Sequence, residues 1–195
     1  MVNDDSFVIR KALRVIGKSL AFRNAAVGDA EFILSLRTDE DRSRYLSYTS
    51  PDLRAQQDWL AKYAEASDQA YFIIESLEGE PFGTVRLYDP KGDSFCWGSW
   101  ILKRDRPSWA AMESALMVYS YAVDHLGFHR SHFDVRKGNE KVWTFHERFG
   151  AVRVAENELD YFYELGLDAI RTSLAKYRKY LPESVSVEWL NTVSN

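Results

Sequence analysis

Hydrophobic and polar positions change period several times along the first third of the chain. Residues 19–25 (SLAFRNA) form a short run typical of a strand, and residues 28–37 (GDAEFILSLR) place apolar side chains at helical spacing, with Asp29 in the capping position. Residues 50–66 begin with a Ser-Pro pair that suits a first helical turn, and then repeat leucine and aromatic residues at helical intervals. The pattern predicts one strand followed by two helices.

Three strand-like runs come next, at residues 69–76 (QAYFIIES), 80–89 (EPFGTVRLYD) and 94–102 (SFCWGSWIL). The segments between them, LEG and PKGD, are plausible hairpin turns, so the three runs predict an antiparallel meander. Gly98 interrupts the third run. A glycine within a strand indicates a bulge or the close approach of another group.

The second half begins with a long helix after residue 107 that ends at Gly127 as its C-cap. Its predicted buried stripe consists of Ala111, Ala115, Val118, Ala122 and Leu126. A strand, a short helix, a late strand and a closing helix follow, at residues 131–139, 140–150, 160–167 and 168–181. Together the elements predict an α/β fold, a mixed and mostly antiparallel sheet flanked by helices. We expect a single domain over residues 1–195 with a core at about residues 20–180, and loose attachment of residues 1–18 and 182–195.

Composition narrows the class of partner. The chain has 46% apolar and 28% charged residues, a net charge of −4, and scattered Lys and Arg, which argues against a nucleic-acid or anionic-membrane partner. We find no export signal or apolar segment long enough for membrane insertion, and expect a cytoplasmic protein. The single cysteine, Cys96, excludes an intrachain disulfide, and with four histidines it leaves no paired ligand sets for zinc, so no metal is expected.

The start of the long helix carries the first chemical signal. It follows Arg106 directly, and its first-turn region, Ser108 to Ala111, contains little bulk apart from Trp109. A helix N-terminus offers unpaired backbone N–H groups and the positive end of the helix dipole, so a bare one beside an arginine suits a phosphate or pyrophosphate. The alternative is that the alanines simply favour helix and that Arg106 is a solvated loop charge.

This segment resembles the GCN5-related N-acetyltransferase (GNAT) family. The family signature is Arg or Gln, two residues, Gly, any residue, and Gly or Ala, between a strand and a helix. Arg106, Ala111 and the helix opening at residues 113–116 fall in that register, while Trp109 stands at the first glycine. Residues 120–151 are similar to the next family stretch, a helix ending in LGF, a strand, an Asn and a short helix closing on Gly. The resemblance spans roughly residues 20–180 and is strongest at residues 97–151.

The resemblance implies a GNAT-type acyl-CoA N-acyltransferase fold, splayed after its fourth strand to admit acetyl-CoA. Pantetheine or the acetyl carbonyl would contact the backbone of Trp100, Ile101 and Leu102, whose N–H groups could stabilise an oxyanion. The pyrophosphate would lie on Arg106 and on the helix start, at Ser108, Trp109, Ala110, Ala111 and Met112. Trp109 is expected to be helical rather than left-handed, with its ring pointing outward or covering part of the cofactor. Asn139 would bind the cofactor, orient its loop or cap the next helix.

The catalytic candidates follow from direct transfer of an acetyl group to an amine. Where the family often has a tyrosine as general acid, this chain has His146, which as an imidazolium could protonate the departing thiolate; the alternative is a packed or surface histidine. Asp134 or Glu75 could accept the amine proton, although strand carboxylates are commonly just solvated. Arg86 and Tyr88 share a strand face and could hold a phosphate or a sugar hydroxyl of the acceptor.

The residues favour a small primary amine as the acceptor. Residues 83–89, 95–102 and 133–151 look similar to the GNAT branch that acylates amino sugars on nucleotide carriers. A competing branch acetylates protein N-termini and includes the ribosomal protein alanine acetyltransferases. A non-catalytic acyl-CoA-binding module is a third alternative, because Trp109 replaces a glycine and the family tyrosine near Asn139 is missing. Pairing of exposed strands into a homodimer is left open.

Overall fold

A nine-stranded sheet runs through the computed structural model, which describes residues 7–190 without the side chains of residues 42 and 43. The strand order is β7-β8-β6-β5-β4-β3-β2-β1-β9, and every neighbouring pair is antiparallel except β5 and β6. The strands are β1 (Ala12–Ile16), β2 (Leu20–Asn24), β3 (Ala70–Ser76), β4 (Pro81–Lys91), β5 (Ser94–Leu102), β6 (Arg130–Arg136), β7 (Val152–Glu156), β8 (Asp160–Gly166) and β9 (Ser186–Trp189). The mixed, mostly antiparallel sheet confirms the predicted fold class.

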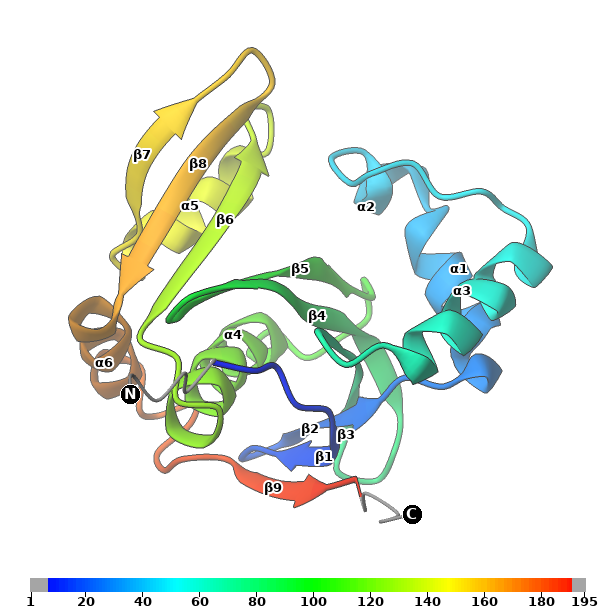
Figure 1. The fold of residues 1–195 in the computed structure, drawn as a ribbon, viewed down its shortest axis with the longest axis horizontal. Helices are drawn as coiled ribbons and strands as arrows, with labels where there is room; N and C mark the ends of the chain where they lie inside the picture. Colours follow the sequence, from blue (N-terminus) through cyan, green and yellow to red (C-terminus); the bar gives the residue numbers. More distant parts are fainter. Residues whose placement is uncertain (1–6, 191–195) are drawn as a thin grey trace, which may run out of the picture.

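Helices lie on both sides of this sheet (Figure 1). They are α1 (Ala30–Arg37), α2 (Glu40–Ser43), α3 (Leu53–Glu65), α4 (Ala110–Ser120), α5 (Glu140–Arg148) and α6 (Leu167–Lys176), with short turns η1 (Val27–Asp29) and η2 (Tyr121–His125). In Figure 1, α1, α2 and α3 form one group beside β4, whereas α5 lies against β6, β7 and β8. These two groups flank the open end of the sheet.

The parallel pair β5 and β6 separates soon after it begins. Register pairs join Ser94 to Arg130 and Phe95 to Ser131, and beyond them the strands diverge (Figure 1). Trp97 is buried just past this point, with its ring 5.2 Å from the His146 ring and 5.6 Å from the Tyr119 ring. The two strands thus separate where rings from β5, α4 and α5 pack together.

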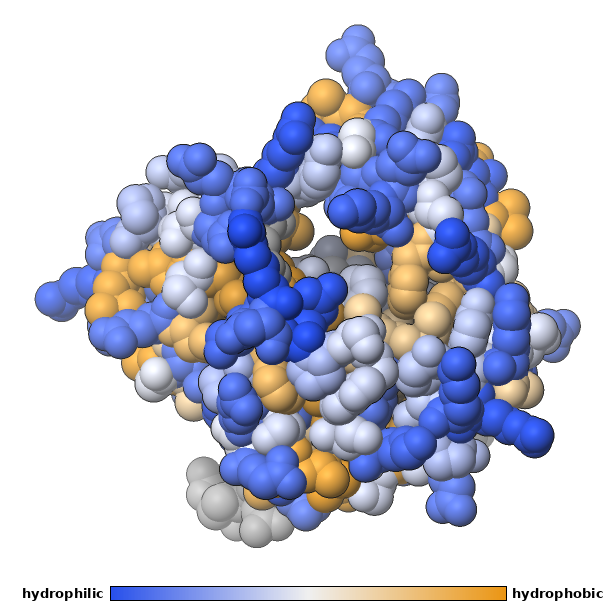
Figure 2. Space-filling model, turned by 180° about the vertical axis from the view of Figure 1, so that it is seen from behind, coloured by the Kyte–Doolittle hydropathy of each residue, from blue (hydrophilic) through white to orange (hydrophobic). Residues whose placement is uncertain are grey.

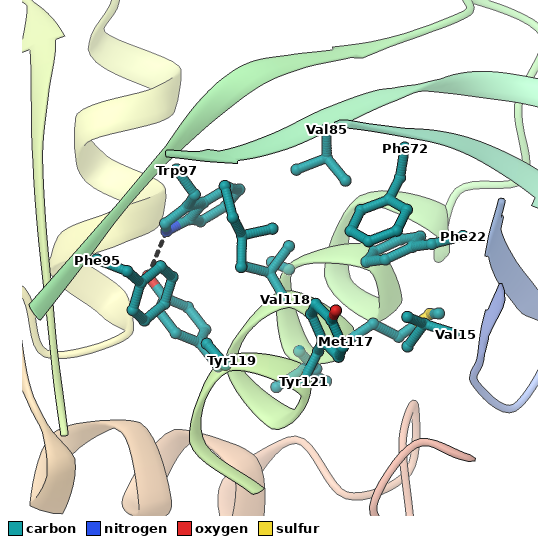
Figure 3. Close-up of a cluster of buried hydrophobic side chains, with 14 of the residues drawn as sticks. Val15, Phe22, Phe72, Val85, Phe95, Trp97, Met117, Val118, Tyr119 and Tyr121 are labelled. Atoms are coloured by element: carbon teal, nitrogen blue, oxygen red, sulfur yellow. Dashed lines mark hydrogen bonds between the residues drawn. The ribbon is translucent and has the colours of Figure 1, made fainter. Parts of the chain in front are cut away.

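Helix α4 forms the centre of the core. Of the predicted buried stripe, Ala115, Val118 and Ala122 are fully buried, whereas Ala111 and Leu126 are only partly buried. The burial is not confined to that stripe, because all residues from Glu113 to Ser120 are buried. The helix is enclosed because aromatic side chains of several strands converge on it (Figure 3). Trp97 Nε1 donates to the Tyr119 hydroxyl at 3.2 Å, which satisfies both polar groups inside this core.

A buried carboxylate joins α4 to the turn between β1 and β2. Glu113 Oε1 accepts hydrogen bonds from the backbone N–H groups of Ser19, at 2.6 Å, and Leu20, at 3.0 Å. Burial raises the pKa of Glu113, and these backbone donors act in the opposite direction. The contact fixes the first hairpin against the central helix.

Both ends of the described chain belong to the sheet. The sequence predicted loose attachment of residues 1–18 and 182–195, yet β1 pairs with both β2 and β9. Strand β1 buries Ala12 and Val15, and Val185 is buried beside β9. These strands are four or five residues long, too short for a clear periodic pattern, which is why the prediction failed. Residues 1–6 and 191–195 lie outside the described residues.

Two smaller differences from the sequence predictions concern local signals. Strand β7, which the sequence analysis did not predict, has only five residues, too few for a clear periodic pattern, and all of them are exposed. Helix α3 is capped by Asp52, whose side chain accepts from Arg54 N at 2.9 Å, and not by the Ser-Pro pair before it. Among residues 7–190, no helix has the length and apolar character needed to cross a membrane.

Candidate active site

A β-bulge distorts β5 where the sheet opens. Val85 of β4 faces two residues of β5, Ser99 and Trp100, and Ser99 has a φ of 48°. Thr84 Oγ1 donates to the Ser99 carbonyl at 2.8 Å, which holds the bulge in place. A Cβ on Gly98 would lie 3.1 Å from the Tyr88 hydroxyl. Both the bulge and the close approach expected at this glycine are therefore present.

A large cavity of about 970 Å³ lies between the diverging strands. The end of β5 forms one wall and the first turns of α5 form the other, while the start of α4 and the segment after α2 complete it. Figure 2, viewed from the side opposite to Figure 1, shows a hollow in the surface. The hollow lies between the group formed by α1, α2 and α3 and the group formed by α5 with β6, β7 and β8. A hollow of this size is large enough for a cofactor.

The predicted cofactor residues divide into two groups around this cavity. Those that line it are Trp100, Ile101, Leu102, Arg106, Ala111 and Asn139. The lining does not include Ser108, Trp109, Ala110 or Met112 among the described residues. Ala110 is fully buried and Trp109 packs against the hydrophobic core. Trp109 is only partly buried, and it does not line the large cavity, so of the two expected positions for its ring the one covering that cavity is not seen.

The start of α4 is helical from its first residue. Trp109 is the N-cap with a φ of −83°, so the left-handed conformation of a glycine is not used here. None of the described side chains caps this N-terminus. Arg106 reaches the same cavity, with its Nη1 donating to the Lys103 carbonyl at 2.8 Å. Helix start and guanidinium together form an electropositive corner of the large cavity.

A second cavity, of about 290 Å³, continues from the first towards the point where β5 and β6 separate. The two share five lining residues: Tyr45, Leu46, Trp100, Asn139 and Val142. Asn139 is the N-cap of α5, but its side chain makes no capping hydrogen bond among the described residues. Its amide is thus available at the junction of the two cavities, as the cofactor or loop-orienting role requires.

His146 lines the second cavity from its inner side and is only 5% exposed. Its ring lies 4.2 Å from the Phe133 ring, and its Nδ1 is buried without a hydrogen-bond partner among the described residues. Burial lowers the pKa of His146 to about 3. At neutral pH the ring is therefore uncharged, which corrects the expectation of an imidazolium at this position.

Asp134 faces the second cavity from β6, together with Asp160 at the start of β8. The side chain remains accessible to solvent, yet partial desolvation raises the pKa of Asp134, and the negative charge of Asp160 raises it further. A carboxylate with a raised pKa is a better proton acceptor than an ordinary one. Glu75 does not share this position, because it is buried and pairs with Arg14 and Arg23.

The segment after α2 reaches the cleft, although its sequence predicts no role there. Tyr45 follows α2 and lies against the backbone of Gly138, where a Cβ would come 3.0 Å from the Tyr45 ring. The Arg37 guanidinium fixes the same segment, donating to Thr49 Oγ1 at 2.5 Å and to Ser47 Oγ at 3.1 Å. Residues 44–52 have no apolar periodicity, so nothing in their sequence pattern pointed to the cleft.

A third cavity, of about 330 Å³, adjoins the second and contains Arg86 of β4. Arg86 and Tyr88 project from the same face of β4, as the alternation predicted, with Arg86 in the third cavity and Tyr88 in the second. The two cavities share Arg37, Ser47 and Ser99. The three hollows thus follow one another along the opened edge of β5.

Within residues 7–190, no group of His, Cys, Asp and Glu is arranged to hold a metal ion. Cys96 is buried, and burial raises the pKa of its thiol to about 11. A thiol with this pKa remains protonated near neutral pH and is a poor nucleophile.

Comparison with known proteins agrees with this architecture. A family model described as an acetyltransferase (GNAT) domain matches residues 19–152. Among solved structures, apo FdhC, described as a nucleotide-linked sugar GNAT, is 36% identical to the chain with a TM-score of 0.77. The alignment covers 89% of this chain and 99% of FdhC. No curated protein matches the chain.

More distant structures share the fold. A GCN5-related N-acetyltransferase from Brucella melitensis is 19% identical, with a TM-score of 0.70 over 85% of this chain and 84% of its own. A chimera of the spermidine N-acetyltransferase SpeG from Vibrio cholerae and hSSAT is 16% identical, with a TM-score of 0.68 over 79% of this chain and 99% of its own. At these identities the likeness concerns the arrangement of helices and strands alone.

Proposed function

The chain belongs to the GNAT acetyltransferase family, and we propose that it transfers the acetyl group of acetyl-CoA directly to the primary amine of an amino sugar on a nucleotide carrier. The observation that carries this proposal is the junction of two cavities at the bulge of β5. A donor in the large cavity and an amine in the second one would meet there. Tyr45, Trp100 and Asn139 would surround the point of contact.

The residues of the large cavity suit acetyl-CoA. Arg106 and the uncapped start of α4 offer positive charge and backbone N–H groups to a pyrophosphate, and Ala111 leaves room for its approach. The hydrogen bond from Thr84 to the Ser99 carbonyl holds the bulge of β5, and backbone N–H groups beside it would act as donors where negative charge develops on a carbonyl oxygen. When bound, acetyl-CoA supplies the acetyl group as an activated thioester.

Asp134 is our candidate for the proton acceptor. An acceptor amine arrives as an ammonium ion at neutral pH and must lose a proton before it can attack. Asp134 lies in the second cavity with a raised pKa, and can take up that proton directly or through water. His146, uncharged and packed between rings, would shape the wall of the same cavity.

The amino-sugar acceptor is supported by two observations. The 36% identical FdhC is described as a nucleotide-linked sugar GNAT. The contact between Tyr45, which follows α2, and Gly138, which precedes α5, also bridges the cleft. A bridged cleft favours a small acceptor over an extended polypeptide. A protein N-terminus, the alternative acceptor, would need an open groove.

The proposal can be tested by measuring CoA release from acetyl-CoA, and in parallel from propionyl-CoA, with a panel of amines. We expect the highest kcat/KM with nucleotide-linked amino sugars, compared with free amino sugars, spermidine and peptides with an N-terminal alanine. A preference for the peptides would favour the N-terminal acetyltransferase alternative. Saturable acetyl-CoA binding without any CoA release would favour a non-catalytic binding module.

The same assay tests Asp134. We expect Asp134→Asn to lower kcat by about 10²–10⁴-fold while leaving acetyl-CoA affinity unchanged by calorimetry. Because protonation inactivates a base, the wild-type rate should fall as the pH drops through the raised pKa of Asp134, and the variant should lack this limb. In the control Asp160→Asn the limb should move to lower pH, since a neighbouring negative charge is gone. An unchanged rate in Asp134→Asn would remove this residue from the mechanism.

A further inference from the structure

The third cavity has the charge of an anion site. Two arginines, Arg37 and Arg86, line it together with several hydroxyl side chains, and none of its described lining residues is acidic. The Arg37 guanidinium is already hydrogen-bonded to Ser47 and Thr49 and is therefore held in place. A cavity with two cations and no carboxylate attracts negatively charged groups.

Arg86 is held in place by aromatic rings and not by an ion pair to a described residue, although the negative charge of Asp68 acts on it from a distance. Its guanidinium carbon lies 5.2 Å from the centre of the Trp59 ring and 4.8 Å from that of Tyr88. Its Nε is buried, without a hydrogen-bond partner among the described residues. Arg23 on the same sheet shows the contrast, because it pairs with both Asp29 and Glu75. The planar donor fork of Arg86 is thus fixed by aromatic rings and open to a ligand.

The position of this cavity relative to the other two indicates which bound molecule, cofactor or acceptor, would carry the anion. It shares Arg37, Ser47 and Ser99 with the second cavity, but no described residue with the large cavity at the start of α4. The phosphates of a cofactor on α4 would therefore lie at the other end of the cleft. An anion in the third cavity would belong to the acceptor.

We propose that the third cavity binds the phosphate groups of the acceptor through Arg86 and Arg37. The proposal rests on the proposed function and specifies its substrate class: an amine separated from a diphosphate by a sugar ring. The order of the cavities fits that order of groups, with the amine near Asp134 and the diphosphate at Arg86. Trp59 and Tyr88 act as positioning residues that keep the guanidinium plane fixed.

The test measures binding of phosphate probes without turnover. The cofactor site is first saturated with CoA, and the protein is then titrated calorimetrically with uridine diphosphate, thymidine diphosphate, inorganic pyrophosphate and uridine. We expect the diphosphates and pyrophosphate to bind and uridine to bind at least tenfold more weakly. Arg86→Gln should weaken diphosphate binding by about tenfold to a hundredfold, as expected for loss of charge-assisted hydrogen bonds. Arg86→Lys, which keeps the charge without the fork, should lose less.

Controls separate a lost contact from a damaged fold. Arg54→Gln changes an exposed arginine of α3 outside the cavity, and should leave diphosphate binding unchanged. The CoA affinity of Arg86→Gln should match the wild type, because the large cavity does not contain Arg86. A cooperative melting transition checks that the variant is folded.

Three results would overturn the inference: no phosphate probe binds while CoA is bound, uridine binds as tightly as its diphosphate, or Arg86→Gln binds the probes as the wild type does. Failure of the proposed function looks different. If Arg86-dependent phosphate binding is present but no amine accepts an acetyl group, the anion site stands and the transferase assignment falls. If acetyl transfer occurs with equal efficiency to acceptors with and without phosphate, the anion site is refuted and the transferase assignment stands.

Discussion

The imidazole of His146 packs 4.2 Å from the Phe133 ring and 5.2 Å from the Trp97 ring, in an apolar part of the cleft. This environment disfavours the charged form, which is why the pKa of His146 falls to about 3. A neutral histidine at this position contributes to stability in a pH-dependent way. Its role as a proton donor to the thiolate stays a prediction that substitution can test.

We expect acidification to destabilise the protein through His146. The unfolded chain binds a proton here below about pH 6.5, whereas the folded chain does so near its pKa of about 3. Between these values the unfolded state holds more protons, so stability falls as pH falls, by about 1.4 kcal/mol per pH unit from this group. His146→Phe should remove that slope in urea unfolding measured from pH 7 to pH 4.

The same variant tests catalysis. His146→Phe keeps an aromatic ring between Phe133 and Trp97, so at neutral pH its stability should remain within about 1.5 kcal/mol of the wild type. If it also keeps its turnover, His146 is a wall residue, whereas a large loss of kcat with normal acetyl-CoA affinity would restore the proton-donor hypothesis. An unchanged pH dependence of unfolding would show that another group takes up the proton.

At the scale of elements, the pairing of β4 with β5 positions the site. Gly83 faces Leu102 just beyond the bulge, and a Cβ on Gly83 would lie 2.1 Å from the Ile101 carbonyl oxygen. That oxygen belongs to backbone and cannot rotate away. The two strands can approach this closely only because Gly83 has no side chain. Ile101 and Leu102 line the large cavity, so the position of this cavity wall depends on the same close approach.

Gly83→Ala should therefore separate β4 from β5. We expect the free energy of unfolding to decrease by about 2–3 kcal/mol from overpacking, and acetyl-CoA binding to weaken as the cavity wall moves. Gly28→Ala is the matched control, because a Cβ there meets no atom within 4 Å, and its effect should stay within about 0.5 kcal/mol. Chemical denaturation and calorimetry measure the two effects. Equal stability of both variants would mean that the strands tolerate the side chain.

At the scale of the whole molecule, the end of the chain closes the sheet beside its beginning. β9 pairs with β1, and the Arg10 guanidinium lies 4.0 Å from the centre of the Trp189 ring. Val185, 3% exposed, donates its N–H to Ser120 Oγ at 3.2 Å, which connects the final strand to the central helix. The last strand is therefore integrated with the core.

Val185→Ala should lower the free energy of unfolding by about 2 kcal/mol, because it empties a closed part of the core. The adjacent Ser186 is exposed, so Ser186→Ala should change stability by less than about 0.5 kcal/mol. Urea denaturation of the two variants checks the difference. If Val185→Ala were as mild as its control, the loose attachment expected from the sequence would be correct after all.

Local patterns determined a large part of this protein by themselves. The meander β3–β4–β5, helix α4, β6 and α5 were predicted because each has a long apolar pattern or a clear capping residue. The spacing from Arg106 to Ala111 and the Asn139 segment identified the family, because the motif is local in sequence. Six of the ten predicted cofactor residues then line the large cavity for the same reason.

Tertiary structure alone decided the chemistry of the cleft. The charge of His146, the raised pKa of Asp134 and the buried Nε of Arg86, which has no hydrogen-bond partner among the described residues, depend on neighbours from other elements, which no local pattern encodes. The same holds for Tyr45, which reaches the cleft from a segment without periodicity. Sequence periodicity reports which face of an element is buried, whereas pKa values and pockets arise from long-range packing between elements.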